Sequence, residues 1–366
     1  MVDQTASDFH LVSGHYPMFR IYGVITKVSD EIVTAEMAQQ LIYEIMPERN
    51  RLEWEEMHDT DFAYAIPDVG RYRCNVSQTK DGIGANFRLI PSRVLTFEEL
   101  RLPECIKKLC FLTKGLVLAT GPSGCGKTTT LATLIDFINQ NRSDHIITIE
   151  DPIEYVHPHK KCLVNQRQVH IHTDGFKRAL RAALREDPDV VLIGEMRDLE
   201  TVMIAIETAE TGHLVFGTLH TTTAPGTIDR LINQFPSDQQ SQVRVALAEG
   251  LRGVISQTLC KTKDGTRVAA MEVLLSSAAL SAYIREGKIQ QIPMLIQTGR
   301  KEGMCSLNDA LLDYVSKGVI EPTEAYRRAV AKDELIKRMG DLPNVRGPGG
   351  KAWTEDELVK ASAEGK

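Results

Sequence analysis

The chain has 366 residues, of which 42% are hydrophobic and 25% are charged, and its formal net charge is −6. This composition is ordinary for a globular protein with length for roughly two to three domains, and no run approaches the roughly 20 apolar residues of a membrane span. The negative net charge disfavours a broad, non-specific grip on nucleic acid, so we expect no nucleic-acid partner.

Residues 1–95 are predicted to form a small α+β domain. Apolar residues alternate in 18–22 and 71–76, which is typical of strands, and an Asp-Gly-Ile-Gly turn precedes a further strand at 85–90. Between them lies a predicted helix, whose apolar residues recur with helical spacing: Met37, Leu41, Ile42 and Ile45.

A predicted linker at 96–110 leads to a second domain at 111–340, where apolar runs alternate with amphipathic helical patterns. This alternation predicts an α/β fold with a mostly parallel sheet flanked by helices. The candidate buried strands are 115–120, 145–149, 189–194, 214–219 and 269–275. The glycine-rich, charged tail at 341–366 is expected to be poorly ordered.

A phosphate-binding loop follows the first of these strands. The segment Gly-Pro-Ser-Gly-Cys-Gly-Lys-Thr matches G-x-x-x-x-G-K-[ST] and opens a helical pattern, which is the context that this motif requires. Its backbone N–H groups can turn towards an anion that also meets the positive end of the helix. Lys127 is expected to reach the β- and γ-phosphates of ATP, and the Thr128 hydroxyl to bind Mg²⁺. The predicted nucleotide-binding residues here are Gly121, Ser123, Gly124, Cys125, Gly126, Lys127, Thr128 and Thr129.

Carboxylates follow two other predicted strands. Glu195 ends an apolar run, where it is expected to hold Mg²⁺ through a water molecule. Glu150, Asp151 and Glu154 follow a second strand, and such a cluster suits the polarisation of an attacking water. The Asp151-Pro152 pair also predicts a turn, and the two interpretations are compatible because the turn can aim Glu154.

Histidines and arginines complete the candidate set. His220 follows the strand at 214–219, where a sensor of the γ-phosphate would lie, whereas the position of His213 before that strand suits a capping role equally well. Arg73 and Arg88 lie on or beside predicted strands of the N-terminal domain, where such residues are usually solvated. They become functional only if the nucleotide of a neighbouring subunit faces them.

The seven cysteines are scattered and contain no C-x-x-C pair, so we do not expect a zinc ribbon. We expect the cysteines to be reduced thiols of a cytosolic protein. Cys125 lies inside the phosphate loop near a helix N-terminus, where the pKa of a thiol tends to fall. Two interpretations stay open for this residue. It is a small residue that fills the loop, or its oxidation inhibits nucleotide binding.

Four segments resemble the Walker A, Asp box, Walker B and His box motifs of the secretion ATPase superfamily. They are Gly121–Thr128, Ile147–Tyr155, Gly194–Asp198 and Thr211–His220. Within the superfamily the chain is most similar to the retraction motors of bacterial type IV pili, over about residues 6–340, with further matches near both ends at Ala6–Leu11 and Ile284–Lys288.

This resemblance implies a homohexameric, ATP-hydrolysing motor for pilus retraction and twitching motility, which uses ATP and Mg²⁺. Each subunit would have a PAS-like N-terminal domain and a RecA-like P-loop NTPase core. By position, Glu154 matches the catalytic glutamate, Arg73 and Arg88 the nucleotide-facing arginines, and His213 and His220 the His-box pair, with His213 near the nucleotide. The implied location is the cytoplasmic face of the inner membrane, on a pilus platform protein, with only indirect membrane contact.

Other functions were weighed against this one. An accessory retraction paralogue would share all four motifs. Extension and type II secretion ATPases usually carry a longer N-terminal region and a tetracysteine insert, which this sequence lacks. A DNA-dependent RecA-type ATPase shares the core, but the net charge disfavours it. A GTPase switch lacks its base-reading motif, and a module that only binds nucleotide would have lost its carboxylates.

Overall fold

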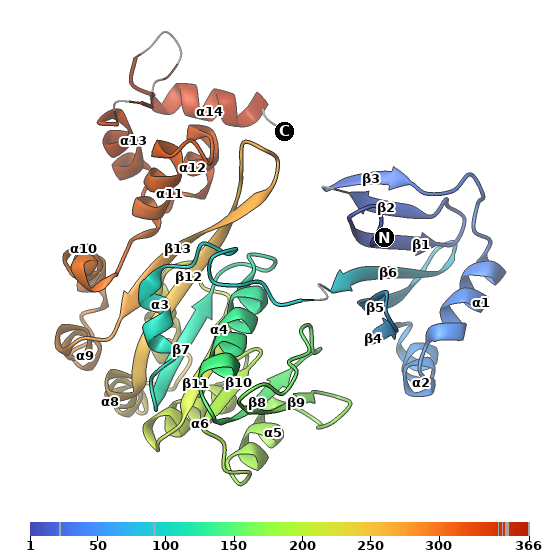
Figure 1. The fold of residues 1–366 in the computed structure, drawn as a ribbon, viewed down its shortest axis with the longest axis horizontal. Helices are drawn as coiled ribbons and strands as arrows, with labels where there is room; N and C mark the ends of the chain where they lie inside the picture. Colours follow the sequence, from blue (N-terminus) through green and yellow to red (C-terminus); the bar gives the residue numbers. More distant parts are fainter. Residues whose placement is uncertain (22, 91–92, 343, 346, 348–350, 365–366) are drawn as a thin grey trace. The chain divides into compact units, whose positions relative to one another are not determined.

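The computed structural model describes the chain except residues 22, 91–92, 343, 346, 348–350 and 365–366 (Figure 1). It contains two compact units. The first comprises Met1–Val94 together with Pro152–Val156, and the second comprises Leu95–Asp151 and His157–Lys366. Within the part of the chain that the structure describes, no helix has the length and apolar character needed to cross a bilayer.

The first unit is built on a six-stranded sheet in the order β3-β2-β1-β6-β5-β4, in which neighbouring strands are antiparallel. The strands are β1 Ala6–Val12, β2 Met18–Ile21, β3 Val24–Lys27, β4 Asp59–Ile66, β5 Gly70–Thr79 and β6 Gly82–Ile90, and the helices are α1 Ala35–Ile45 and α2 Glu48–Met57. Helix α1 begins where the Thr34 side chain accepts from the Met37 N–H. It packs on β6, and α2 packs on β4.

The second unit is built on a seven-stranded sheet in the order β13-β12-β7-β11-β10-β8-β9. All neighbouring pairs are parallel except β12 and β13. The strands are β7 Gly115–Thr120, β8 His145–Glu150, β9 Leu163–Gln168, β10 Val190–Ile193, β11 Leu214–Leu219, β12 Leu251–Lys261 and β13 Arg267–Leu275. The five predicted strands are present, and β9 and β12 are additional, because polar residues interrupt their apolar pattern.

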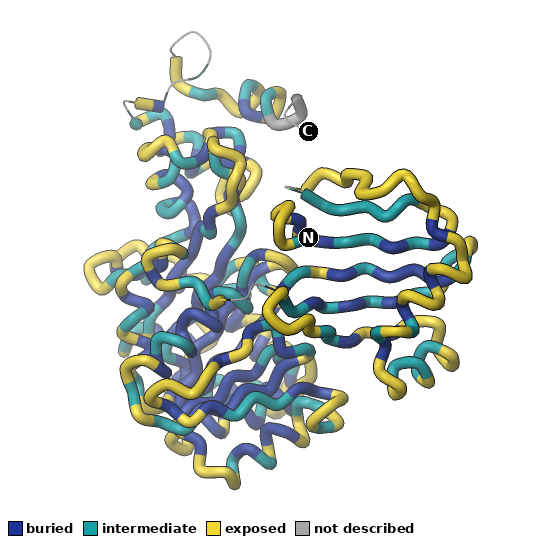
Figure 2. The backbone as a smooth tube through the Cα atoms, turned by 45° about the vertical axis from the view of Figure 1, so that its right-hand side comes forward, coloured by how far each residue is buried: buried dark blue, intermediate teal, exposed yellow. Residues whose placement is uncertain are grey.

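Helices cover both faces of this sheet, whose central strands are buried along their length (Figures 1 and 2). Alternate residues of β7 contribute to different apolar clusters, Leu116 and Leu118 to one and Val117 and Ala119 to the other. Sheets of parallel strands are buried in this way in α/β proteins, and the predicted fold class is confirmed.

The helices of the second unit are listed here in chain order. They are α3 Glu104–Leu109, α4 Lys127–Asn141, α5 Phe176–Ala183, α6 Leu199–Glu210, α7 Ala224–Asn233, α8 Gln240–Gly250, α9 Ala278–Arg285, η1 Ile289–Gln291, α10 Ile292–Thr298, η2 Gly299–Glu302, α11 Leu307–Ser316, α12 Pro322–Arg328, α13 Lys332–Gly340 and α14 Glu355–Glu364. The last of them, from α11 onwards, pack around an apolar cluster that also contains Cys260 of β12 and Val268 and Ala270 of β13.

Two predicted segments differ from the structure. The predicted linker at 96–110 belongs to the second unit, because Phe97 and Ile106 are buried in its apolar core and α3 forms within it. The tail at 341–366 was expected to be poorly ordered, and part of it (343, 346, 348–350 and 365–366) lies outside the described residues. Among its described residues, α14 forms and Leu358 is fully buried against the C-terminal helices. The few apolar residues that pack this tail against the other helices are widely spaced among charged residues. The composition of the tail therefore does not reveal them.

Ile135 tests the contribution of α4 to the core of the second unit. Its side chain is fully buried, so Ile135→Ala should lower the free energy of unfolding by about 2–5 kcal/mol. Gln140→Ala on the same helix removes an exposed side chain and should change this free energy by less than about 0.5 kcal/mol. Urea unfolding followed by circular dichroism measures both, and equal losses in the two variants would contradict the burial of α4.

Candidate active site

The phosphate loop connects the buried end of β7 to α4. Gly121, Gly124 and Gly126 have φ values of +143°, +75° and +93°, which glycine adopts most readily. At Gly121 a Cβ atom would lie 2.3 Å from the carbonyl oxygen of Gln257 and 2.6 Å from the Cys125 Sγ, so no side chain fits there. The loop therefore needs this glycine both for its conformation and for its close approach to β12.

The remaining loop residues lie at the positions that the motif assigns to them. Ser123 and Gly124 are exposed at the loop, whereas Thr128 and Thr129 are half-buried in the first turn of α4. The Lys127 ammonium is buried and donates to the carbonyl oxygens of Gly121 at 2.8 Å and Pro122 at 3.2 Å. The ammonium and the helix N-terminus thus bring positive charge to one short stretch of backbone.

Gln257 of β12 holds this loop from the side, and the sequence analysis missed it. Its Nε2 donates to the Cys125 carbonyl oxygen at 2.7 Å, and its Oε1 accepts from the Thr130 hydroxyl at 2.9 Å. Gln257 is buried, so both hydrogen bonds are shielded from water. The Cys125 carbonyl and the Gly126 N–H belong to one planar peptide group. The hydrogen bond to the carbonyl therefore also sets the direction of the Gly126 N–H. A polar residue inside an otherwise apolar strand was the available signal.

The order of the strands brings His220 and Glu195 to the same edge of the sheet as the phosphate loop. Leu219 pairs with Thr120 across β11 and β7, so His220 is the next residue beside the start of the loop. Strand β10 pairs with β11 on the side opposite β7, and Glu195 follows β10 in the chain. The His220 Nε2 lies 2.7 Å from the Glu195 Oε1, and this ring nitrogen carries the proton when the carboxylate accepts.

Arg197 is a second partner of Glu195 that the sequence analysis missed. Its guanidinium lies 2.7 Å from the Glu195 Oε2, so the two carboxylate oxygens have different partners. Burial works to raise the pKa of Glu195, but the hydrogen bonds from Arg197 and His220 lower it below its usual value. Glu195 is therefore an anion at neutral pH, which suits a ligand of a hard cation.

The structure separates His213 from the phosphate loop. His213 precedes β11, and its carbonyl accepts from the Gly115 N–H, at the end of the sheet where β7 begins rather than where it ends. The imidazole Nδ1 lies 3.1 Å from the Thr208 carbonyl oxygen. His213 was predicted to bind nucleotide. A six-residue strand of about 20 Å lies between His213 and the phosphate loop of its own chain, and this geometry favours the capping interpretation.

The Asp box is divided between the two units. Glu150 is buried at the end of β8, where it accepts from the Thr148 hydroxyl at 2.6 Å and from the Gln166 amide at 3.1 Å. Glu154 is half-buried in the segment Pro152–Val156, which groups with the first unit. Glu150 is thus committed to the local structure of the second unit, and Glu154 is not part of that network.

Arg73 and Arg88 lie opposite each other on β5 and β6, on the face of the first sheet that points away from α1 and α2. Arg88 forms a 2.9 Å ion pair with Asp8, and Arg73 lies 3.8 Å from Asp61. Burial works against the ionisation of Asp8, yet hydrogen bonds from Ser7 and Arg88 lower its pKa. The structure brings the two arginines together, in the unit that does not contain the phosphate loop.

The environment of Cys125 answers the question of its reactivity. The thiol is buried beside the Gly121 backbone. Burial raises the pKa of Cys125 above its ordinary value and outweighs the nearby Lys127 charge. The expected fall in pKa is therefore wrong, and the structure favours the role of a small residue that fills the loop.

Comparisons with known proteins place the chain in a family. The model of the Type II/IV secretion system protein family matches residues 2–279. The Type IV pilus retractation ATPase PilT of Pseudomonas aeruginosa is 50% identical over 326 residues, which cover 89% of this chain and 95% of that protein. The chain belongs to the Type II/IV secretion system protein family.

Two further relatives differ in how similar they are to this chain. The crystal structure of the pilus retraction motor PilT with bound ADP matches with a TM-score of 0.86 and 46% identity, and covers 92% of this chain and 96% of that one. The Type IV pilus ATPase PilU of Pseudomonas aeruginosa is 36% identical over 336 residues, which cover 92% of this chain and 88% of that protein. The RecA-like core predicted from the resemblance is confirmed.

Gln257→Met tests the side support of the phosphate loop in this secretion system family member. Methionine keeps the length of the side chain and loses both hydrogen bonds, which leaves the buried Cys125 carbonyl and Thr130 hydroxyl unsatisfied. Such a loss costs about 1–3 kcal/mol, so ADP and ATP should bind about tenfold more weakly. Thr258→Val on the same strand is the matched control and should bind nucleotide normally. Isothermal titration calorimetry measures the nucleotide affinity of both variants. An unaltered affinity in Gln257→Met would show that Gln257 does not support the phosphate loop.

Proposed function

We propose that this chain is an ATP-hydrolysing motor that drives the retraction of type IV pili. The observation that carries the proposal is the phosphate loop beside the His220–Glu195 pair. The chain that contains it is 50% identical to a pilus retraction ATPase over 89% of the chain and 95% of that relative. The loop supplies the cradle for a triphosphate, and the pair supplies an anion and a proton donor at the adjacent strand ends. These are the parts that triphosphate hydrolysis needs.

In this proposal, ATP binds to the residues of the loop. The backbone N–H groups of Gly124 and Gly126 and the Lys127 ammonium contact the phosphates, while Ser123 and Thr129 line the same loop. The loop reaches these contacts without rearranging its glycines, because their φ values already suit a turn around an anion. Glu154 is proposed to orient the attacking water, a role that suits a carboxylate.

The donor atoms available here suit Mg²⁺. The Thr128 hydroxyl and the ionised Glu195 carboxylate are hard oxygen ligands, and Glu195 is proposed to act through water. Among the described residues there is no cluster of three or more His, Cys, Asp or Glu side chains that could hold a metal. Mg²⁺ needs none, because it usually combines one or two protein ligands with waters and phosphate oxygens. When bound, the ion would neutralise charge on the phosphates.

His220 is proposed to report the presence of the γ-phosphate. Its ring is half-exposed, and its Nε2 already has one partner in Glu195. A third phosphate that competes for this N–H would release one oxygen of Glu195. Such a difference in contacts between ATP and ADP is what allows a nucleotide to shift a conformational equilibrium.

The assembly is proposed to be a homohexamer on a pilus platform protein at the cytoplasmic face of the inner membrane. Arg73 and Arg88, which share one face of the first sheet, are proposed to act on the nucleotide of a neighbouring subunit. The accessory-paralogue alternative is less well supported, because identity to PilU is 36% and identity to PilT is 50%.

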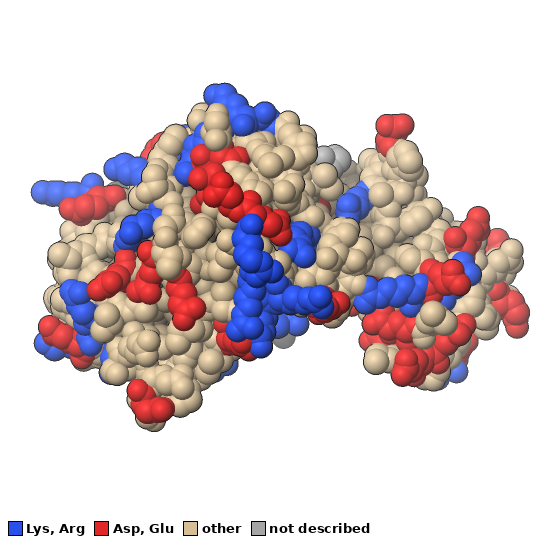
Figure 3. Space-filling view, turned by 90° about the horizontal axis from the view of Figure 1, so that it is seen from below, with Lys and Arg blue, Asp and Glu red and all other residues tan. Residues whose placement is uncertain are grey.

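The charge pairing of one basic helix bears on the nucleic-acid alternative. On the face shown in Figure 3, Lys and Arg side chains form a contiguous patch near the centre, with Asp and Glu side chains beside it. On the basic helix α5, Lys177 and Arg181 both pair with Glu200, and Arg178 pairs with Asp174. Such balanced charge is a poor footprint for a polyanion.

Two variants separate binding from hydrolysis. Glu195→Gln keeps the size of the side chain and removes its charge, so ATP turnover should fall about 10²-fold or more while nucleotide still binds. Lys127→Ala should weaken both, because its ammonium contacts the phosphates themselves. Phosphate release and binding of a fluorescent ATP analogue measure the two effects at one protein concentration.

The same variants test the role in pilus retraction. A deletion strain complemented with the wild-type gene should regain twitching motility, and one complemented with Glu195→Gln should not. Turnover of Glu195→Gln at the wild-type rate would refute the proposed chemistry. Normal retraction in the deletion strain would refute the proposed place in the pilus system and leave the ATPase chemistry standing.

A further inference from the structure

The connection between β8 and β9 is held by the helix that carries the phosphate loop. Neighbouring parallel strands are usually joined by a crossover helix, whose backbone N–H and C=O groups form hydrogen bonds with one another. Here residues 151–162 contain neither helix nor strand, so their backbone groups need partners elsewhere. Many of those partners come from the last turns of α4.

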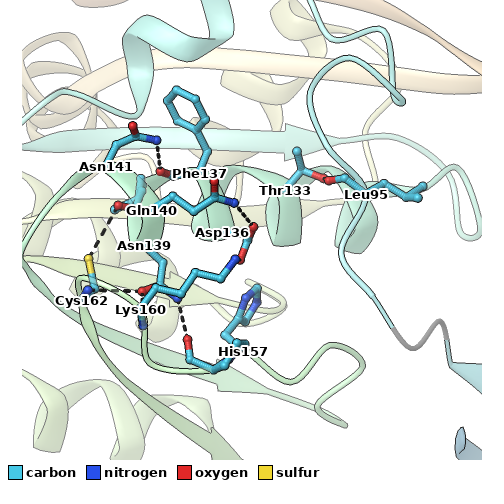
Figure 4. Close-up of polar contacts among 12 residues, drawn as sticks. Leu95, Thr133, Asp136, Phe137, Asn139, Gln140, Asn141, His157, Lys160 and Cys162 are labelled. Atoms are coloured by element: carbon cyan, nitrogen blue, oxygen red, sulfur yellow. Dashed lines mark hydrogen bonds and ion pairs between the residues drawn. The ribbon is translucent and has the colours of Figure 1, made fainter.

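Asn139 is the centre of this attachment (Figure 4). Its side chain is fully buried, and its Nδ2 donates to the Pro158 carbonyl oxygen at 2.7 Å. Its Oδ1 accepts from the N–H groups of Lys160 at 3.1 Å and Cys162 at 3.2 Å. The Asn139 backbone carbonyl accepts from the Lys161 N–H at 2.9 Å. One residue of α4 thus binds four points of the connection between Pro158 and Cys162.

Two further contacts fix the same stretch. The Lys160 ammonium forms a 2.6 Å ion pair with Asp136, one turn earlier on α4 (Figure 4). The His157 N–H donates to Gln166 Oε1 at 2.7 Å, and Gln166 in turn donates to Glu150. The anchored stretch therefore begins at His157, immediately after the segment that contains Glu154.

This placement links two functional segments through one helix. Asn139 lies on the same helix as Lys127, about 18 Å further along its axis. A helix buried along one side moves as a unit, so a shift of its phosphate-binding end is transferred to the residues bound at its other end. The residues bound there continue directly into Pro152–Val156.

We propose that Asn139 is a positioning residue that couples the phosphate loop to the Glu154 segment. The inference rests on the proposed role of Glu154 in orienting water. Asn139 touches neither nucleotide nor water in this account, and it acts by holding residues 158–162 on α4. Its loss leaves the phosphate loop intact and frees the chain that follows Glu154.

The test compares Asn139→Ala with Asn141→Ala in the full-length protein. Asn141 is a matched control, because it is exposed and its amide donates to the Phe137 carbonyl of its own helix. Asn139→Ala should lower kcat about tenfold and change the dissociation constant of an ATP analogue less than twofold. Asn141→Ala should change neither. A wild-type kcat in Asn139→Ala, or equal losses in kcat and in affinity, would overturn the inference.

A double-variant cycle separates coupling from a loss of structure. If Asn139 acts through Glu154, then Asn139→Ala should not lower the residual turnover of Glu154→Ala any further. Independent, multiplying losses would overturn the inference and leave the proposed role of Glu154 intact. Wild-type turnover in Glu154→Ala alone would instead refute the role of Glu154, so the two failures are distinguishable.

Hydrogen exchange in the wild-type protein decides the matter if Asn139→Ala does not fold. A non-hydrolysable ATP analogue with Mg²⁺ should slow amide exchange at Lys160 and Cys162, although neither residue belongs to the phosphate loop. Unchanged exchange in peptides that cover 157–163, together with slowed exchange in peptides that cover 121–130, would overturn the coupling.

Discussion

The close approach of the phosphate loop to β12 is the constraint on which the site depends. The chain leaves β7 so near to Gln257 that residue 121 has no room for a Cβ atom, and the turn that follows needs glycine again at two positions. Strand β12 thereby supports the loop on one side and orients its peptide groups before any ligand binds. Preorganised backbone dipoles of this kind stabilise anionic charge without reorganisation.

The strand order then decides which side chains meet this loop. Because β11 lies between β7 and β10, the residues that follow all three strands emerge along one edge, and His220 and Glu195 meet there at 2.7 Å. The same order places His213 at the opposite edge, although it lies only seven residues before His220 in the sequence. Their positions at opposite ends of one strand therefore separate the two histidines, as the sequence already indicated.

Much of the second unit follows from its sequence, because parallel strands buried on both faces are nearly continuous apolar runs. Five strands and the loop between β7 and α4 were predictable on that basis. Strand β12 was not, since Ser256, Gln257 and Thr258 interrupt its apolar pattern. Of these, Ser256 contacts Thr120 and Gln257 contacts the loop itself, so the support that β12 gives the loop is part of what concealed the strand.

Partners that are distant in sequence were also beyond prediction. Gln257 contacts the phosphate loop across more than a hundred residues, and Asn139 binds the connection after β8 from a neighbouring helix. The misassigned linker has a related cause: Phe97 and Ile106 lie within it, yet they belong to the apolar cluster that contains Val117 and Ala119 of β7. Tertiary packing decided each case, and local propensity carried no signal for it.

These features describe a loop shaped for phosphate and a surrounding frame that aims acidic and basic groups at it. Determination of the structure with a non-hydrolysable ATP analogue and Mg²⁺ tests this most directly. The account predicts density for the phosphates against the N–H groups of Gly124 and Gly126 and the Lys127 ammonium, with Glu195 directed towards the ion. Phosphates bound elsewhere, or a Glu195 side chain turned away from them, would contradict it.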